Sequence, residues 1–191
     1  MRYSATHKEE TRTKLLESSG NIAKTGGFDS TGVDALMAAL GLTGGAFYSH
    51  FSSKQDLFAA LVEREIDRSA KMLAGTPDSP SDHVSKCVRS YLSTFHAEHP
   101  ESGCVLVALG AEIARSSPEV RAGVEQSLKQ VQSAWTGRLG GDKGKAWAVM
   151  AQLIGALVLA RVVESPRTRQ QILTSSRSAV QEMTLNSPPL G

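Results

Sequence analysis

Two short helical patterns separated by a single glycine constrain the fold of this chain most strongly. In the first pattern, Leu36 and Leu40 continue an apolar stripe at helical spacing. Gly41 follows, at a place where glycine most easily forms the left-handed turn that ends a helix. In the second pattern, Phe47 and Phe51 are four residues apart, so they share one face of a helix and can anchor it to a core. The sequence therefore predicts a helix, a tight turn and a second helix.

Both helices are preceded by residues that can begin them. Thr31 and Asp34 have the spacing of a capping pair, in which the threonine side chain accepts a backbone N–H. Thr43 can cap the second helix, predicted over residues 43–51. Ser53 has the same relation to an acidic residue three positions later, and this pair predicts the start of a longer helix.

The outer faces of the second helix carry small and polar residues, namely Thr43, Gly44, Tyr48 and His50. A short helix with a buried aromatic seam and a hydrogen-bonding outer face suits the major groove of DNA. An ordinary antiparallel pair of core helices is the alternative, because short glycine turns between helices are common.

The run from Thr31 to Phe58 resembles the DNA-binding domain of the TetR/AcrR family of transcriptional regulators. The resemblance covers about residues 8–60 and is loose beyond them. It is carried by Gly45, Phe47, Tyr48, His50, Phe51, Lys54 and Leu57. It implies that Gly45 allows a close approach of the backbone to DNA or to the preceding helix. The positions that it implies touch DNA are Thr31, Thr43, Gly44, Tyr48, His50 and Lys54.

The chain departs from this family pattern at Gly44, where many members carry lysine or arginine. If that cation contacts a base, its absence removes about 1–3 kcal/mol of discrimination. Gly44 and Gly45 each weaken a helix by about 1 kcal/mol relative to alanine. We therefore expect part of the recognition helix to become ordered only when it binds DNA. Sequence preference is expected to depend on DNA shape and on residues such as Ala46 and Ser49.

Net charge does not by itself indicate a nucleic-acid partner. The formal charge of all 191 residues is +2, and residues 1–58 hold six Lys or Arg against six Asp or Glu. Any electrostatic attraction to phosphate must come from how the charges are distributed, for example from Arg2, His7 and Lys8 near the amino terminus. Lys54 at a helix start combines its charge with free backbone N–H groups.

The remaining sequence predicts an all-α fold, since residues that favour helices are plentiful and alternating strand patterns are few. We expect a helix-turn-helix head over residues 1–55, built from three helices. A linking helix over 54–74 joins it to an effector-binding and dimerisation domain over 75–191. About nine helices are expected, over 8–25, 31–40, 43–51, 54–74, 81–96, 104–115, 118–139, 143–163 and 166–185.

The carboxyl-terminal helices carry more apolar surface than one core face needs, and they resemble the pair that forms the family's dimer interface. The predicted interface residues are Trp147, Val149, Met150, Leu153, Ile154, Leu157 and Val158. The alternative is that this helix is the centre of a monomeric bundle. A dimer predicts a palindromic operator, read by two heads about one DNA turn apart.

A mostly apolar pocket for a small hydrophobic or aromatic effector is expected in the second domain. The candidate lining residues are Tyr91, Phe95, His96, Cys104, Leu106, Val107, Trp135 and Met150. Plain core packing is the alternative for each of them. Cys104 has a further alternative, because it follows Gly103 at the start of a helix and can become a sensor thiol for electrophiles or oxidants.

The sequence thus predicts a ligand-responsive regulator, in which repression is favoured by the resemblance alone. An enzyme is not expected: His96, His99, Cys104 and Glu112 make no convincing catalytic set, and no phosphate-binding glycine loop follows a strand. No metal and no cofactor are expected. A helical protein-binding module without DNA is a further alternative.

The apolar run over 146–160 is shorter than the roughly 20 residues that span a bilayer, and the amino terminus lacks a signal-like core. A cytoplasmic location is expected.

Overall fold

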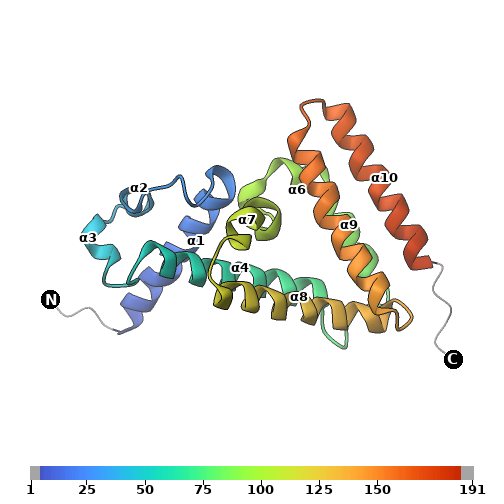
Figure 1. The fold of residues 1–191 in the computed structure, drawn as a ribbon, viewed down its shortest axis with the longest axis horizontal. Helices are drawn as coiled ribbons and strands as arrows, with labels where there is room; N and C mark the ends of the chain where they lie inside the picture. Colours follow the sequence, from blue (N-terminus) through green and yellow to red (C-terminus); the bar gives the residue numbers. More distant parts are fainter. Residues whose placement is uncertain (1–4, 186–191) are drawn as a thin grey trace. The chain divides into compact units, whose positions relative to one another are not determined.

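The computed structural model describes the backbone of residues 5–185 and the side chains of residues 8–184. Within this range the chain forms ten α-helices, one 3-10 turn and no strand, which confirms the predicted all-α class (Figure 1). Arg2 and His7 lie outside the described side chains. The chain divides into two compact units, residues 1–66 with 100–123 and residues 67–99 with 124–191.

Unit 1 contains the predicted helix-turn-helix. Its first helix buries Leu15 and Ala23, whereas Ile22 is only partly buried. Phe28 fills the core from the turn after this helix, with its ring centroid 4.8 Å from that of Phe58. The elements of unit 1 are α1 (Ala5–Gly26), α2 (Val33–Ala38), α3 (Gly44–Phe47), most of α4 (Lys54–Ala74), η1 (Pro100–Ser102), α7 (Val105–Ala114) and the start of α8 (Pro118–Arg138).

The helix α7 packs with the head in this division, although the sequence prediction placed its residues in an effector domain over 75–191. Val105, Leu109 and Ile113 are its buried residues, at a spacing of four. The functional division at residues 55 and 75 stays a prediction.

Unit 2 is built around the helices α9 (Lys143–Val162) and α10 (Pro166–Leu185), which lie side by side in Figure 1. The indole N–H of Trp135 donates to the carbonyl of Leu73 over 2.6 Å, which fixes α8 against the end of α4. The predicted helix over 81–96 is two helices, α5 (His83–Tyr91) and α6 (Thr94–Glu98). The break follows from Ser93, whose hydroxyl accepts the N–H of His96 and so begins a new helix.

The predicted Ser53 cap is confirmed, and two other predicted side-chain caps are wrong. Ser53 accepts the N–H of Asp56, and Asp142 likewise accepts the N–H of Lys145 at the start of α9. In contrast, α2 begins after Gly32, and Thr31 donates its hydroxyl to the carbonyl of Gly27. The Thr43 side chain makes no capping hydrogen bond to α3.

Among the described helices, α9 is the one with the length and apolar character of a membrane-crossing helix. The central helix of a helical bundle has the same character, and seven of its residues are buried in unit 2.

Candidate nucleic-acid interface

The turn between α2 and α3 forms as the sequence predicts. Gly41 has a φ of +67°, the left-handed conformation that glycine adopts without strain. The N–H of Leu42 donates to the carbonyl of Met37 over 3.0 Å, and this bond closes the end of α2. The first helix of the pair buries Leu36 and Met37. The helix-turn-helix geometry is therefore set by a local glycine turn.

The recognition helix α3 is one turn long, shorter than the predicted range 43–51. Tyr48 ends it, and the chain continues through a turn to Phe51. Phe47 and Phe51 are nonetheless both buried, with ring centroids 5.8 Å apart, which confirms the predicted anchor. The two adjacent glycines at its start give a physical reason for the short helix, because glycine lowers helix stability.

Over this anchor, the surface of the recognition segment is open to solvent. Thr43, Gly45 and Ser49 are exposed, and the Tyr48 side chain is 68% exposed. The Tyr48 ring lies edge-on against Phe47, with centroids 5.3 Å apart. This contact fixes the aromatic ring of Tyr48, while the hydroxyl group remains available for hydrogen bonding.

Gly44 lies against the carboxylate of Asp34, a neighbour that the sequence pattern did not indicate. A Cβ atom at this position would collide with Oδ1 of Asp34, on the first turn of α2. A side chain at position 44 would therefore require the Asp34 side chain to move. At Gly45 a Cβ atom would meet no atom of the chain within 4 Å.

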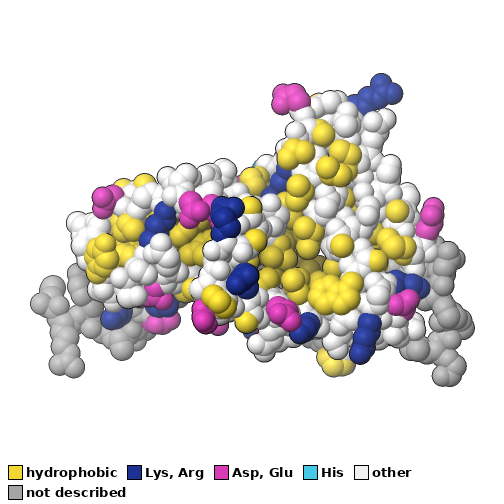
Figure 2. Space-filling view, viewed as in Figure 1, with side chains coloured by type: hydrophobic (Ala, Val, Ile, Leu, Met, Phe, Trp, Pro, Cys, Tyr) yellow, Lys and Arg dark blue, Asp and Glu magenta, His cyan; other side chains and the backbone are white. Residues whose placement is uncertain are grey.

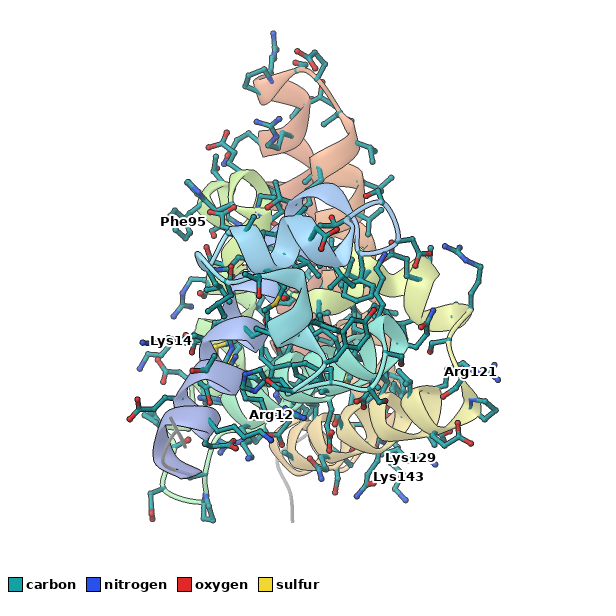
Figure 3. All side chains as sticks on the ribbon, turned by 90° about the vertical axis from the view of Figure 1, so that its left-hand side faces the viewer. Arg12, Lys14, Phe95, Arg121, Lys129 and Lys143 are labelled. Atoms are coloured by element: carbon teal, nitrogen blue, oxygen red, sulfur yellow. The ribbon has the colours of Figure 1, made fainter. Side chains whose placement is uncertain are left out.

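Arg12 on α1 lies beside the recognition segment close to His50, and it is a candidate that sequence reasoning missed. The guanidinium carbon of Arg12 lies 4.4 Å from the centroid of the Phe51 ring. Burial, followed by the charges of Lys8 and Arg12, lowers the pKa of His50. Nδ1 of His50 is buried and has no hydrogen-bond partner. Cations on α1 thus supply positive charge near α3, and the figure labels Arg12 and Lys14 on this helix (Figure 3).

Lys54, the first residue of α4, is held by the turn after α1. Its Nζ donates to the carbonyl of Asp29 over 2.9 Å and lies 5.0 Å from the centroid of the Phe28 ring. An ammonium has three donor protons, so this arrangement leaves donors for an external acceptor. The start of α4 is fixed by Ser53 and by the Asp56 carboxylate, which accepts the N–H of Ser52 over 3.0 Å.

The predicted effector residues fall in both units. Cys104, Leu106 and Val107 belong to unit 1, and the other five belong to unit 2. Trp135 and Met150 are buried, whereas Phe95 is exposed and its ring stacks on His99 at 4.3 Å. A groove of about 250 Å³ between α5 and α10 is lined by other residues, among them Ser85, Val88, Arg89, Thr174, Arg177 and Gln181. The predicted effector set stays a prediction.

The predicted dimer residues require a correction, because α9 buries much of its predicted interface inside unit 2. Val149, Met150, Leu153 and Leu157 are buried within the chain and cannot form an outward surface. Ile154 is partly buried. The exposed large apolar residues are Trp147 and Val158 from the predicted set, with Leu159 and Val162 in addition. Figure 2 shows hydrophobic side chains gathered over α9.

The family model described as "Bacterial regulatory proteins, tetR family" matches residues 15–61, which include α2, α3 and the start of α4. The chain is 25% identical over 128 residues to the HTH-type transcriptional repressor NemR of Escherichia coli strain K12. That alignment covers 65% of this chain and 64% of the repressor, so it spans less than two thirds of the relative's length. The HTH-type transcriptional activator FasR of Mycolicibacterium smegmatis is 24% identical over 162 residues, 84% of this chain and 72% of the activator.

Solved structures show the same fold. The reduced form of E. coli NemR superposes with a TM-score of 0.77 at 21% identity, covering 95% of this chain and all of that chain. A TetR transcriptional regulator from Legionella pneumophila superposes with a TM-score of 0.75 at 17% identity, covering 96% of this chain and all of that one. With their glycine turn and buried aromatic anchor, residues 15–61 of this chain match the tetR family of bacterial regulatory proteins, and the chain as a whole shares the fold of these solved regulators.

Proposed function

We propose that the chain is a ligand-responsive transcriptional regulator that binds double-stranded DNA through α3. The observation that carries this proposal is the solvent-exposed surface of Thr43, Gly45, Tyr48 and Ser49 over a buried phenylalanine pair. The named relatives are transcriptional regulators, which supports a regulatory rather than an enzymatic role and a cytoplasmic location. Repression is the proposed direction, because the E. coli relative is a repressor.

The proposed contacts follow from the chemistry of the site. Tyr48 presents a hydroxyl to a phosphate oxygen or its ring to a thymine methyl group, and Lys54 supplies a cation at the start of α4. Thr43 and Gly44 are at the leading end of α3, closest to the base edges. His50 is partly exposed at the end of the recognition segment, and Thr31 offers a hydroxyl that is engaged with Gly27 in the unbound chain. Arg12 joins this set from the structure.

We further propose that the protein acts as a homodimer on a palindromic operator. Two copies related by a twofold axis would place their α3 helices roughly 34–36 Å apart, one turn of B-DNA. The exposed apolar side chains of α9 supply a surface of the kind that marks an interface.

In the proposed mechanism a small hydrophobic or aromatic effector favours a dimer whose head separation no longer fits DNA. The helix α4 carries the change, since its residues belong to both compact units. To move the population from mostly bound to mostly released conformations, the effector must favour the released one by about 5 kcal/mol. A thiol-sensing mechanism is not favoured by the structure, because Cys104 is buried.

Selection of bound duplexes from a random pool tests the proposal. The expected result is a palindromic consensus whose half-sites are about ten base pairs apart or a related spacing. Binding is expected to weaken steeply as salt is raised, because phosphate contacts release counterions. Recovery of no enriched sequence, together with no duplex binding at low salt, would favour the helical protein-binding module instead.

Replacing Tyr48 by alanine is expected to weaken operator binding about 5- to 10-fold, because it removes roughly one hydrogen bond and the contact made by the aromatic ring. The exposed position of Tyr48 predicts an unfolding free energy close to that of the wild type. Fluorescence anisotropy with a labelled operator gives the affinity, and urea unfolding gives the stability. The matched variant Tyr48→Phe retains the ring, so it separates the hydroxyl from the aromatic contact. Unchanged affinity in both variants would remove Tyr48 from the interface.

Replacing Gly45 by alanine is expected to raise the free energy of unfolding by about 0.5–1 kcal/mol and yet to weaken DNA binding. The added methyl group meets no atom of the chain, but it occupies the space through which the backbone approaches the duplex. Gly44→Ala is the comparison variant for stability, because its methyl group requires the exposed Asp34 side chain to move and its gain in stability is expected to be smaller. A Gly45→Ala variant that binds the operator as tightly as the wild type would show that the backbone does not approach DNA closely there.

A further inference from the structure

The carboxylate of Glu112 holds the turn that follows α1. Its Oε1 accepts the backbone N–H of Phe28 over 3.1 Å and that of Asp29 over 3.2 Å, and its Oε2 lies 3.3 Å from the Phe28 nitrogen. Glu112 belongs to α7 and is more than 80 residues away in sequence. Hydrogen bonds from N–H groups to an ionised carboxylate are among the stronger ones in proteins. The position of this turn is therefore set by a helix outside the helix-turn-helix.

The same turn holds Lys54 on its other side. The carbonyl of Asp29 accepts a hydrogen bond from Nζ of Lys54, and the Phe28 ring faces that ammonium at 5.0 Å. Phe28 and Asp29 thus donate their N–H groups to Glu112 and present a carbonyl and a ring to Lys54. Arg115, one turn after Glu112, adds only an exposed ion pair at 3.8 Å to the Asp29 carboxylate.

We propose that Glu112 is a positioning residue for the DNA contact made by Lys54. The inference rests on the proposed function, in which Lys54 meets a phosphate at the start of α4. Without the Glu112 carboxylate, two N–H groups lose their acceptor and the Phe28–Asp29 turn relaxes. The Lys54 ammonium then loses its fixed carbonyl partner and samples several positions, so its phosphate contact becomes less frequent. Through this connection, α7 controls how well the head binds DNA.

The sign of the effect distinguishes this role from simple electrostatics. Removing a carboxylate from a DNA-binding unit raises its net charge by one, which on its own strengthens binding to phosphate. Positioning predicts the opposite, a weaker complex. Glu63→Ala is the matched control, because Glu63 is an exposed residue of α4 in the same unit and its loss changes only charge.

The experiment measures operator affinity at several salt concentrations for the wild type, Glu112→Ala, Lys54→Gln and the double variant. Glu112→Ala is expected to bind about 3- to 10-fold more weakly and to reduce the salt slope by about one, as a lost phosphate contact does. The double variant is expected to bind no more weakly than Lys54→Gln, because both changes remove the same contact. Glu112→Gln retains a carbonyl acceptor and is expected to restore part of the affinity.

Hydrogen exchange at the Phe28 and Asp29 amides supplies a readout that does not involve DNA. Both amides are expected to exchange faster in Glu112→Ala, while the buried amides of α4 keep their protection. The inference is overturned if Glu112→Ala binds as tightly as the wild type, if its effect adds fully to that of Lys54→Gln, or if the two amides are unchanged. A wild-type protein with no salt-dependent DNA binding would instead overturn the proposed function, and the inference with it.

Discussion

Replacement of Lys24 by methionine is expected to lower the free energy of unfolding by about 3–5 kcal/mol. Nζ of Lys24 lies 2.8 Å from Oε2 of Glu65, and the two side chains are only 1% and 6% exposed. The lysine also donates to the carbonyl of Gly103 over 3.4 Å. Methionine removes the Lys24 ammonium from the buried Glu65 carboxylate, and loss of one partner of a buried pair is one of the most destabilising changes available in a protein core. Urea unfolding followed by circular dichroism measures the difference.

Two controls make this prediction specific. The double variant Lys24→Met with Glu65→Leu removes both charges, and it is expected to recover most of the loss because a buried pair gives little net stability over apolar residues. Glu17→Gln breaks the partly exposed pair between Glu17 and Arg64, and it is expected to change stability by less than about 1 kcal/mol. A Lys24→Met variant as stable as the wild type would mean that the ion pair is open to water in solution.

Replacement of Leu159 by aspartate is expected to convert the proposed dimer to a monomer. Leu159 and Val162 are 55% and 72% exposed on α9, so a charge there is harmless to the isolated chain but is desolvated in an interface. The operator affinity is expected to fall by about 100-fold or more, because the second head no longer binds as part of the same complex. Light scattering coupled to gel filtration measures the mass, and anisotropy measures the affinity.

Ala122→Asp is the matched control for this charge, because Ala122 is exposed on α8 in unit 1. It is expected to retain the dimer mass and to lose affinity only slightly through repulsion of phosphate. If Leu159→Asp remains dimeric, the exposed apolar face of α9 is not the interface. If the wild-type protein is monomeric at micromolar concentration and still binds a palindrome tightly, the dimer proposal itself is wrong.

The local signals in the sequence predicted the head well. Gly41 forms the turn, and Phe47 and Phe51 form the anchor, because each depends on backbone conformation or helical spacing within a few residues. The Ser53–Asp56 cap was predictable for the same reason. The Thr31 cap failed because a competing acceptor, the carbonyl of Gly27, lies within reach of that hydroxyl after α1 ends.

Apolar periodicity could not assign the faces of α9. This helix is apolar around most of its circumference, so the sequence showed excess apolar surface without showing which residues face unit 2. Packing against α10 and α6 decides that Leu153 and Leu157 point inward, whereas Leu159 and Val162 remain outside.

By itself, the sequence determined the Gly41 turn, the Ser53 cap, the helix-turn-helix pattern and the aromatic anchor of α3. These features depend on interactions between neighbouring residues, which a linear pattern records. Only the tertiary structure decided that Glu112 holds the turn after α1, that Asp29 holds Lys54 and that Arg12 stacks on Phe51. The contacts of Glu112 and of Asp29 join residues that are 25 to 84 positions apart in the sequence. Their partners are selected by the packing of whole helices, for which no local spacing gives a signal.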